Sequence, residues 1–362
     1  MEKNIKRKRL LNYFTILSLS LFFFGCGGPT IDKDSEEFDY IEYTTKGIIT
    51  YKGKPFSGSL TESDVTMGVG IKTSKRTYKD GKKDGLWEGY YENGQLEYKY
   101  NFKDGKSDKL WEKYYWNGQL KEKGNYKDGK YDGVQENYYE NGQLKEKGNY
   151  KEGKEVGVQE NYYENGQLKE KGNYKEGKEV GVQESYYENG QLKSKSNYKD
   201  GSTDGMSEVY YENGQLKSKG NYNYNNLIIS ISEEVYGEKD GVWKDYYENG
   251  QLKEKGNYKK GRKDGLWETY YENGQLRYKA NYKDNYYHGV KEIYYVNGQL
   301  SYKVNYKDGQ KDGVKESYYE NGQLEEKGNY IVNPLNGKET RVGVWISYFE
   351  DGRLWSRYNL GY

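Results

Sequence analysis

The sequence predicts an all-β fold, an elongated antiparallel meander in which β-hairpins follow one another in a single sheet. Three observations support this prediction. The stretch Tyr-Tyr-Glu-Asn-Gly-Gln-Leu at residues 138–144 recurs along most of the chain. Its copies are spaced by 24 residues over long runs, and residues 135–158 and 159–182 are identical at all 24 positions. Such a period indicates that one supersecondary unit has been duplicated.

The leucine that ends this stretch marks each of the repeated units. It falls at Leu96, Leu120, Leu144, Leu168, Leu192, Leu216, Leu252, Leu276, Leu300, Leu324 and, in a variant form, Leu354. Each unit in such an array needs only its neighbours for packing. We therefore expect one ladder-like, MORN-like array over residues 75–362 rather than several domains.

Each unit is expected to be a hairpin followed by a second turn. Asn141-Gly142 lies between two runs of strand-forming residues and predicts a two-residue type I′ turn, which needs positive φ at both positions. The return strand would end at the second turn, Glu152-Gly153. A two-residue loop places Tyr139 opposite Leu144, Tyr138 opposite Lys145, and Glu136 opposite Lys147 as a cross-strand ion pair.

Alternation along the strands predicts two unlike faces. One face would carry Tyr139, Leu144, Gly148 and Tyr150, with Trp87, Trp111, Trp243, Trp267 and Trp345 joining it in other units. The opposite face would carry Val134, Glu136, Tyr138, Lys145 and Lys147. Only 33% of the residues are apolar, mean hydropathy is −1.26, and 46 tyrosines are present, so stacked aromatic rows should replace an aliphatic core.

Residues 1–25 are predicted to be a signal peptide. A basic segment that includes Lys6 and Arg9 precedes an apolar stretch at residues 10–24, which is short for a transmembrane helix. Cys26 follows at once. Because it is the only cysteine, the chain cannot form an intrachain disulfide. The junction resembles the lipobox of bacterial lipoproteins, which implies lipidation of Cys26 and a membrane-anchored protein of the cell envelope, in the outer membrane if the cell is Gram-negative. An uncleaved anchor is the alternative.

Three further segments complete the expected organisation. Residues 26–46 are polar and acidic and suggest a solvated spacer. Residues 47–74 read as a degenerate capping repeat, in which Pro55 would protect a sheet edge. Insertions interrupt the array near residues 223–238 and 331–341, both in the same turn of the unit. Without the signal segment the chain is slightly acidic, so no nucleic-acid partner is expected.

The repeated wording resembles one known family. Tyr-Tyr-Glu-Asn-Gly-Gln-Leu, together with Lys-Asp-Gly-Lys-Lys-Asp-Gly-Leu-Trp at residues 79–87, looks like MORN repeats of the bacterial variant type, often labelled YwqK-type toxin-antitoxin antitoxins. The resemblance covers residues 47–358. It implies a β-hairpin ladder used for binding or scaffolding, with no catalytic residues, and the antitoxin label implies a cytosolic partner.

The residues suggest no catalytic, cofactor-binding or metal-binding constellation. His288 is the single histidine and stands where other units have a turn aspartate. The recurring Glu140, Glu164 and Glu188 occupy equivalent positions flanked by lysine, whereas a general acid needs burial or a like charge. We expect the protein to have no enzymatic activity and no cofactor.

Two features are candidates for binding. The apolar run in the first insertion, with Leu227, Ile229 and Ile231, is one that the ladder does not need. The aromatic rows, with Trp243 and Trp267, could hold an envelope glycan or lipid, or could simply form the core of a thin sheet. The leading hypothesis is a non-enzymatic, membrane-anchored repeat lipoprotein that binds or scaffolds a protein or envelope ligand. The alternative is an antitoxin or immunity protein that neutralises a toxin.

Overall fold

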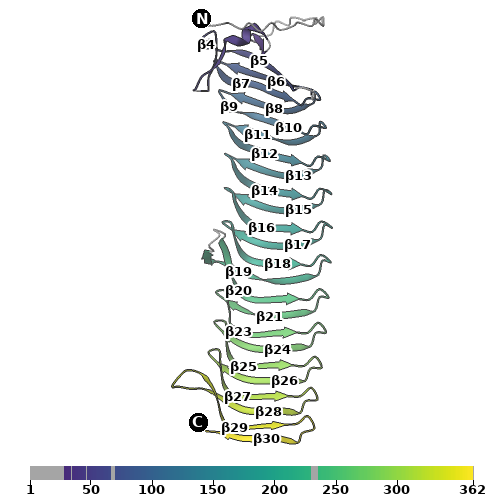
Figure 1. Cartoon of the computed structure of the whole chain (residues 1–362), viewed down its shortest axis with the longest axis vertical. Helices are drawn as coiled ribbons and strands as arrows, with labels where there is room; N and C mark the ends of the chain where they lie inside the picture. The colour runs from purple at the N-terminus through teal and green to yellow at the C-terminus, as the bar shows by residue number, and fades with distance from the viewer. Residues whose placement is uncertain (1–27, 34, 46, 67–69, 230–234, 362) are drawn as a thin grey trace, which may run out of the picture.

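The computed structural model describes residues 28–33, 35–45, 47–66, 70–229 and 235–361. The predicted signal peptide, Cys26 and Ile231 lie outside these residues. The described chain forms one long open sheet, with a small three-stranded sheet at its N-terminal end (Figure 1). The all-β, single-sheet fold predicted from the sequence is confirmed.

The N-terminal region contains short elements and the first long hairpin. They are β1 (Thr30–Asp32), the 3-10 helix η1 (Glu36–Tyr40), β2 (Ile41–Tyr43), β3 (Ile49–Tyr51), β4 (Lys54–Pro55), β5 (Gly58–Thr66) and β6 (Gly70–Lys79).

The array follows with its two strands per unit. They are β7 (Lys82–Tyr90), β8 (Leu96–Lys103), β9 (Lys106–Ser107), β10 (Lys109–Tyr114), β11 (Leu120–Lys127), β12 (Lys130–Tyr138), β13 (Leu144–Lys151), β14 (Lys154–Tyr162), β15 (Leu168–Lys175), β16 (Lys178–Tyr186), β17 (Leu192–Lys199), β18 (Ser202–Tyr210), β19 (Leu216–Ile229), β20 (Val235–Tyr246), β21 (Leu252–Lys259), β22 (Arg262–Lys263), β23 (Gly265–Tyr270), β24 (Leu276–Lys283), β25 (Tyr286–Tyr294), β26 (Leu300–Lys307), β27 (Gln310–Tyr318), β28 (Leu324–Val332), β29 (Glu339–Tyr348) and β30 (Leu354–Leu360).

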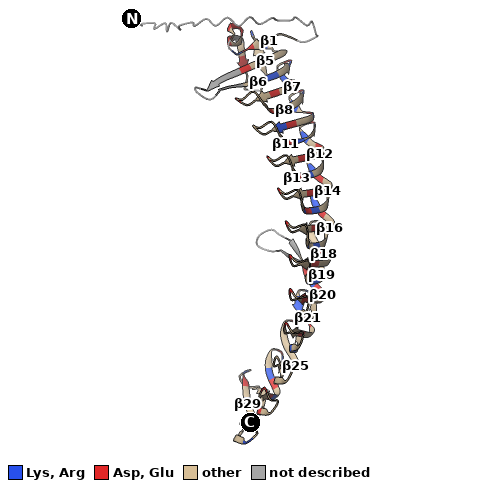
Figure 2. Cartoon of the chain, turned by 90° about the vertical axis from the view of Figure 1, so that its right-hand side faces the viewer, with Lys and Arg blue, Asp and Glu red and all other residues tan. Residues whose placement is uncertain are grey.

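Strands β5 to β30 pair antiparallel with their neighbours in chain order. β9 and β10 both pair with β8, and β22 and β23 both pair with β21, because each short strand continues into the next. β1 pairs in parallel with β5 and completes a sheet of 27 strands. Seen from the side, the sheet bows along its length, and acidic and basic segments alternate over it (Figure 2).

The Asn-Gly turn differs from the predicted type I′ turn. Only Gly142 of the pair has positive φ, at 86°. Its N–H donates to the Tyr139 carbonyl at 2.9 Å, and the Tyr139 N–H donates to the Gln143 carbonyl at 2.8 Å. The loop is therefore a type I turn followed by a glycine bulge. The Asn141 carboxamide favours this geometry because its oxygen accepts the Gln143 N–H at 2.9 Å.

The three-residue loop shifts the register beside it by one residue, and a second bulge, at Lys145, restores the predicted register further along. Tyr138, rather than Tyr139, lies opposite Leu144, and the predicted pairing of Tyr138 with Lys145 is replaced. Beyond the bulge Glu136 lies opposite Lys147, as predicted, and the two side chains form an ion pair at 3.1 Å. Positive φ at two successive positions occurs at the second turn instead, with 52° at Glu152 and 83° at Gly153.

The two insertions extend this second turn. In Figure 1 the β19–β20 hairpin and the loop between β28 and β29 both lie on the left-hand edge, opposite the Asn-Gly loops. Regular stacking of the units requires this, since both insertions occupy the same position in their units.

A compact apolar cluster closes the N-terminal end of the array. It consists of Ile31, Ile49, Phe56, Leu60 and Tyr78, all buried, with Phe38, Ile41, Tyr51 and Trp87 packed against them. The segment expected to be a solvated spacer thus contributes Ile31, with 1% of its surface exposed, through β1. It packs there because the outer edge of β5 is available for pairing and the cluster buries its apolar side chain.

Candidate functional site

The edge formed by the Asn-Gly loops holds successive units together. The hydroxyl of Tyr139 donates to the carbonyl of Tyr162 in the next unit at 2.8 Å. The Asn141 amide donates to the carbonyl of Glu164, also in the next unit, at 3.1 Å. The tyrosine contact recurs from Tyr91, Tyr115, Tyr163, Tyr187, Tyr211, Tyr247, Tyr271, Tyr295 and Tyr319. The recurring Tyr and Asn of each loop therefore act as connectors between units.

One face of the sheet carries a repeating charge network. Glu136 accepts hydrogen bonds from Lys123 at 2.7 Å, Lys147 at 3.1 Å and the Tyr138 hydroxyl at 2.6 Å. Burial opposes ionisation of this carboxyl, but the bonds from Lys123, Tyr138 and Lys147 outweigh it and lower the Glu136 pKa to about 2. Equivalent networks surround Glu160, Glu184, Glu268, Glu292 and Glu316. This face neutralises its own charge.

The opposite face carries the aromatic row, and its tryptophans are packing residues. Trp243 and Trp267 are only 7% and 2% exposed. Each lies over a glycine of the neighbouring strand: a β-carbon added at Gly220 or Gly256 would stand about 2 Å from the indole ring. The indole N–H of Trp267 donates to the carbonyl of Asn257 at 3.1 Å. Trp243 and Trp267 are two of the five residues proposed for binding. The structure brings them together in the aromatic row, where both are packing residues.

Two long runs of ring contacts, and the separate pair of Tyr330 and Trp345, make up the row within the described residues. The first extends from Tyr51 to Tyr150 and the second from Tyr222 to Tyr306, with centroids 4.7–6.3 Å apart. Between the runs the tryptophan position is occupied by Gln159, Gln183 and Ser207.

Cations of the chain cover the rings in many units. Lys239 Nζ lies 4.0 Å from the Trp243 centroid, and Lys263 Nζ lies 3.8 Å from that of Trp267. The same contact joins Lys83 to Trp87 and Arg341 to Trp345. Such cation–π contacts stabilise the row and give the runs a basic surface.

The gap between the two runs contains a polar groove. Its volume is about 280 Å³, and its lining includes Glu170, Tyr174, Glu179, Gln183 and Tyr198. Burial raises the pKa of the Glu179 carboxyl, as do the charges of Glu170 and Glu155, although the Tyr174 hydroxyl donates to it at 3.2 Å. Sequence reasoning missed this groove, for which the signal was the replacement of tryptophan by glutamine in three successive units, at Gln135, Gln159 and Gln183.

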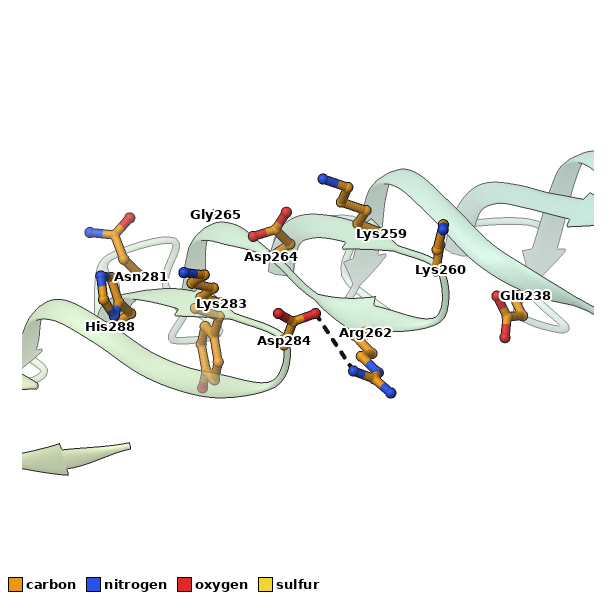
Figure 3. A pocket seen from close by; sticks show the side chains of 11 residues that line it. Glu238, Lys259, Lys260, Arg262, Asp264, Gly265, Asn281, Lys283, Asp284 and His288 are labelled. Atoms are coloured by element: carbon orange, nitrogen blue, oxygen red, sulfur yellow. Dashed lines mark ion pairs between the residues drawn. The ribbon is translucent and has the colours of Figure 1, made fainter. Parts of the chain in front are cut away.

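A wider hollow of about 1060 Å³ lies along the second-turn edge near residues 259–288 (Figure 3). Its walls carry charges of both signs, and Arg262 faces Asp284 at 3.7 Å with both side chains more than half exposed. His288 projects here from β25, and its Nδ1 lies 3.5 Å from Asp308. These groups are solvated, so the hollow provides weak electrostatic interactions.

The first insertion extends the ladder as a longer hairpin. Leu227 and Ile229 belong to β19, where Ile228 pairs with Tyr236 and Ile229 with Val235 in β20. Ile231 lies outside the described residues. The structure thus places Leu227 and Ile229 at the end of an extended turn.

Among the described residues, no group of three or more His, Cys, Asp and Glu side chains is arranged to hold a metal ion. No helix in the same part of the chain has the length and apolar character needed to span a membrane.

The repeats match the family model described as MORN repeat variant. The matches cover residues 83–104, 108–128, 131–152, 155–176, 179–200, 203–224, 239–260, 263–284, 287–308 and 311–331. They occupy more than half of the chain, and the chain belongs to this family.

Solved structures give weaker likenesses. The chain is similar to a crystal structure of TcdB2-TccC3-Cdc42 at 12% identity and a TM-score of 0.17, over 77% of this chain and 17% of that one. For TcdB2-TccC3 without its hypervariable C-terminal region, the identity is 14% and the TM-score 0.17, over 80% of this chain and 18% of that one. For a porin-like protein from Bacteroides uniformis, the identity is 10% and the TM-score 0.14, over 78% of this chain and 92% of that one. The chain spans less than a fifth of the first two, and no inference rests on these likenesses. No curated protein matches the chain.

Proposed function

We propose that this protein is a non-enzymatic, membrane-anchored repeat protein that presents its ladder as a binding platform to a protein or envelope ligand. The observation that carries the proposal is the single layer of the array. Through the repeats, the described residues place no second sheet or helix over either face. Side chains of both faces are half-exposed along the strands, and they are available to a ligand over the whole length.

The internal use of polar groups also favours binding over catalysis. The tyrosine and asparagine connectors and the Glu136-type networks hold units together, and they are satisfied by partners within the chain. A platform of this kind needs rigidity and surface more than a reactive group. Anchoring would come from Cys26, which follows the predicted signal segment.

Replacing Cys26 by alanine is expected to release the protein from the membrane fraction, because the lipid chain would have no attachment point. Fractionation of cells that express each form, followed by immunoblotting, measures this. Ser35→Ala, a nearby change that keeps the cysteine, serves as the matched control. Full retention of the Cys26→Ala protein in membranes would show that lipidation at this position is not the anchor.

Deleting residues 225–236 is expected to keep the fold and membrane attachment while weakening partner capture. The deletion removes the 12 residues by which this unit exceeds the others, and it brings Tyr224 and Gly237 to the positions of Glu152 and Gly153. Gly237 should stay, because its N–H donates to Thr203 Oγ1 at 3.3 Å. The apolar strand ends are the part of the ladder that pairing of the units does not require.

The deletion is tested by cross-linking in whole cells followed by isolation of the anchored protein. A matched deletion of residues 334–339 in the second insertion controls for shortening of a turn. Equal capture by the intact and the 225–236 deletion proteins would assign the first insertion to loop structure alone. Loss of the circular dichroism spectrum would instead show that it completes the sheet.

A further inference from the structure

One carboxylate position of the repeat holds a lysine ammonium in four units. This glutamate stands two residues after the hairpin leucine. The pairs are Lys113 with Glu122 at 2.8 Å, Lys145 with Glu146 at 3.9 Å, Lys263 with Glu254 at 3.1 Å, and Lys315 with Glu326. The ladder therefore contains a recurring ammonium site, which its own lysines fill.

The Lys263 site shows how the ammonium is bound. Its Nζ lies between Glu254 and the rings of Trp267 and Tyr282, 3.8 Å and 5.5 Å from their centroids. A carboxylate on one side and aromatic faces on the other are the groups that recognise an ammonium ion best.

The central groove has the same framework without the lysine. In the repeat, Glu170 is equivalent to Glu254, and Tyr198 is equivalent to Tyr282. Glu179 is equivalent to Lys263, so a carboxylate stands where the other unit has an ammonium group. Gln183 replaces Trp267, and the smaller side chain leaves the groove of about 280 Å³. A second carboxylate thus occupies the place of the internal cation.

Three carboxylates line the groove, and Glu184 pairs with Lys195 at 3.0 Å. The other two, Glu170 and Glu179, have neutral donors only. Glu170 accepts from the Asn161 amide at 3.1 Å, and Glu179 accepts from the Tyr174 hydroxyl at 3.2 Å. Among the described residues, neither forms an ion pair with a lysine or arginine. Lys171, which also lines the groove, pairs with Glu160 at 3.1 Å. Glu170 and Glu179 repel one another, and an incoming cation would relieve that repulsion.

The neutral polar groups of the groove are already engaged with the chain. The Ser185 and Ser194 hydroxyls bond each other at 2.6 Å, and the Gln183 amide donates to the carbonyl of Asn173 at 2.9 Å. Hydroxyl recognition, as for a sugar, would have to break these bonds. The charged groups therefore determine which ligand the groove favours.

We propose that this groove binds a primary ammonium group, namely a lysine side chain presented by the partner, between Glu170, Glu179 and the rings of Tyr174 and Tyr198. The inference deepens the binding function proposed above and depends on it. The partner's lysine takes the place that Lys263 fills from within the chain.

The test uses the full chain and a short peptide, blocked at both ends, that contains one lysine. Isothermal titration calorimetry measures its affinity at low salt. The same peptide with acetyl-lysine is the ligand control, and a free alkyl diamine distinguishes a peptide lysine from a small amine. We expect the lysine peptide to bind at least about tenfold more tightly than its acetylated form, since acetylation removes the charge. Tighter binding of the diamine than of the lysine peptide would overturn the assignment to a partner protein.

Two variants locate the site. Glu179→Lys with Gln183→Trp installs the arrangement of Lys263 and Trp267, which the fold accommodates elsewhere, and should abolish peptide binding. Glu170→Gln with Glu179→Gln should weaken it about tenfold or more. Glu164→Gln with Glu188→Gln makes the same change in net charge at two exposed loop positions and should leave binding unchanged.

The proposal is overturned if the acetylated peptide binds equally well, or if the Lys-Trp variant retains full affinity. Partner capture in whole cells separates this result from the broader function. If the Lys-Trp variant captures the partner as well as the native protein does, the ammonium site is refuted, but the proposed function as a binding platform is not.

Discussion

Replacing Gly256 by valine is expected to unfold the ladder locally and to lower the free energy of unfolding by about 3 kcal/mol. A β-carbon at this position would lie 2.0 Å from a ring carbon of Trp267, which is almost fully buried. The indole cannot move aside because it is packed between Tyr258 and Tyr282. The backbone there is extended, so the effect would come from steric overlap.

The matched control is Gly148→Val, because Gly148 faces Gln159 rather than a tryptophan. Its β-carbon would meet the end of a flexible amide side chain, so a smaller loss of stability is expected. Hydrogen exchange should show the damage near β21 to β24. Equal loss of protection along the whole chain would contradict a nearest-neighbour array.

Alkaline unfolding is the second large effect that we expect. Burial, aided in places by neighbouring carboxylates, raises the pKa of Tyr78, Tyr114, Tyr150, Tyr186 and Tyr302 from 10.0 to about 12. A raised pKa means that the folded protein holds these protons more tightly than the unfolded chain does. The stabilisation is therefore complete below pH 10 and is lost as the pH rises towards 12.

Parallel measurement of far-ultraviolet circular dichroism and tyrosinate absorbance tests this expectation. The two signals should change together above pH 10, because ionisation of buried tyrosines requires the units to open. Tyr114→Phe removes one of these protons and should move the transition slightly to higher pH. Smooth ionisation at the ordinary tyrosine pKa with unchanged circular dichroism would rule out the linkage.

The hairpin shows what the repeat pattern could and could not predict. The pairing of Glu136 with Lys147 was predicted and is confirmed, although the turn that sets it was assigned the wrong type. A two-residue loop and a three-residue loop with a bulge produce the same register beyond Tyr138. The choice between them depends on the Asn141 side chain, which bonds both to its own loop and to the next unit. The second of these bonds does not exist in a single hairpin.

Contacts between units were the least predictable part. The hydroxyl of Tyr139 reaches the following unit only because neighbouring loops stack with a fixed offset, which periodicity does not determine. Ile31 packs in the N-terminal cluster from a strand of three residues, too short to show alternation. The central groove is lined by side chains from four consecutive strands, so it could not be predicted without the register that aligns them.

The connectors between units also bear on how the length of this protein can change. Each Tyr139-type hydroxyl and Asn141-type amide donates to the unit that follows. Recombination between identical segments such as residues 135–158 and 159–182 can therefore insert or remove a whole unit while every remaining donor keeps an acceptor. The reach of the ladder becomes a heritable quantity, adjustable in steps of two strands, about 10 Å each.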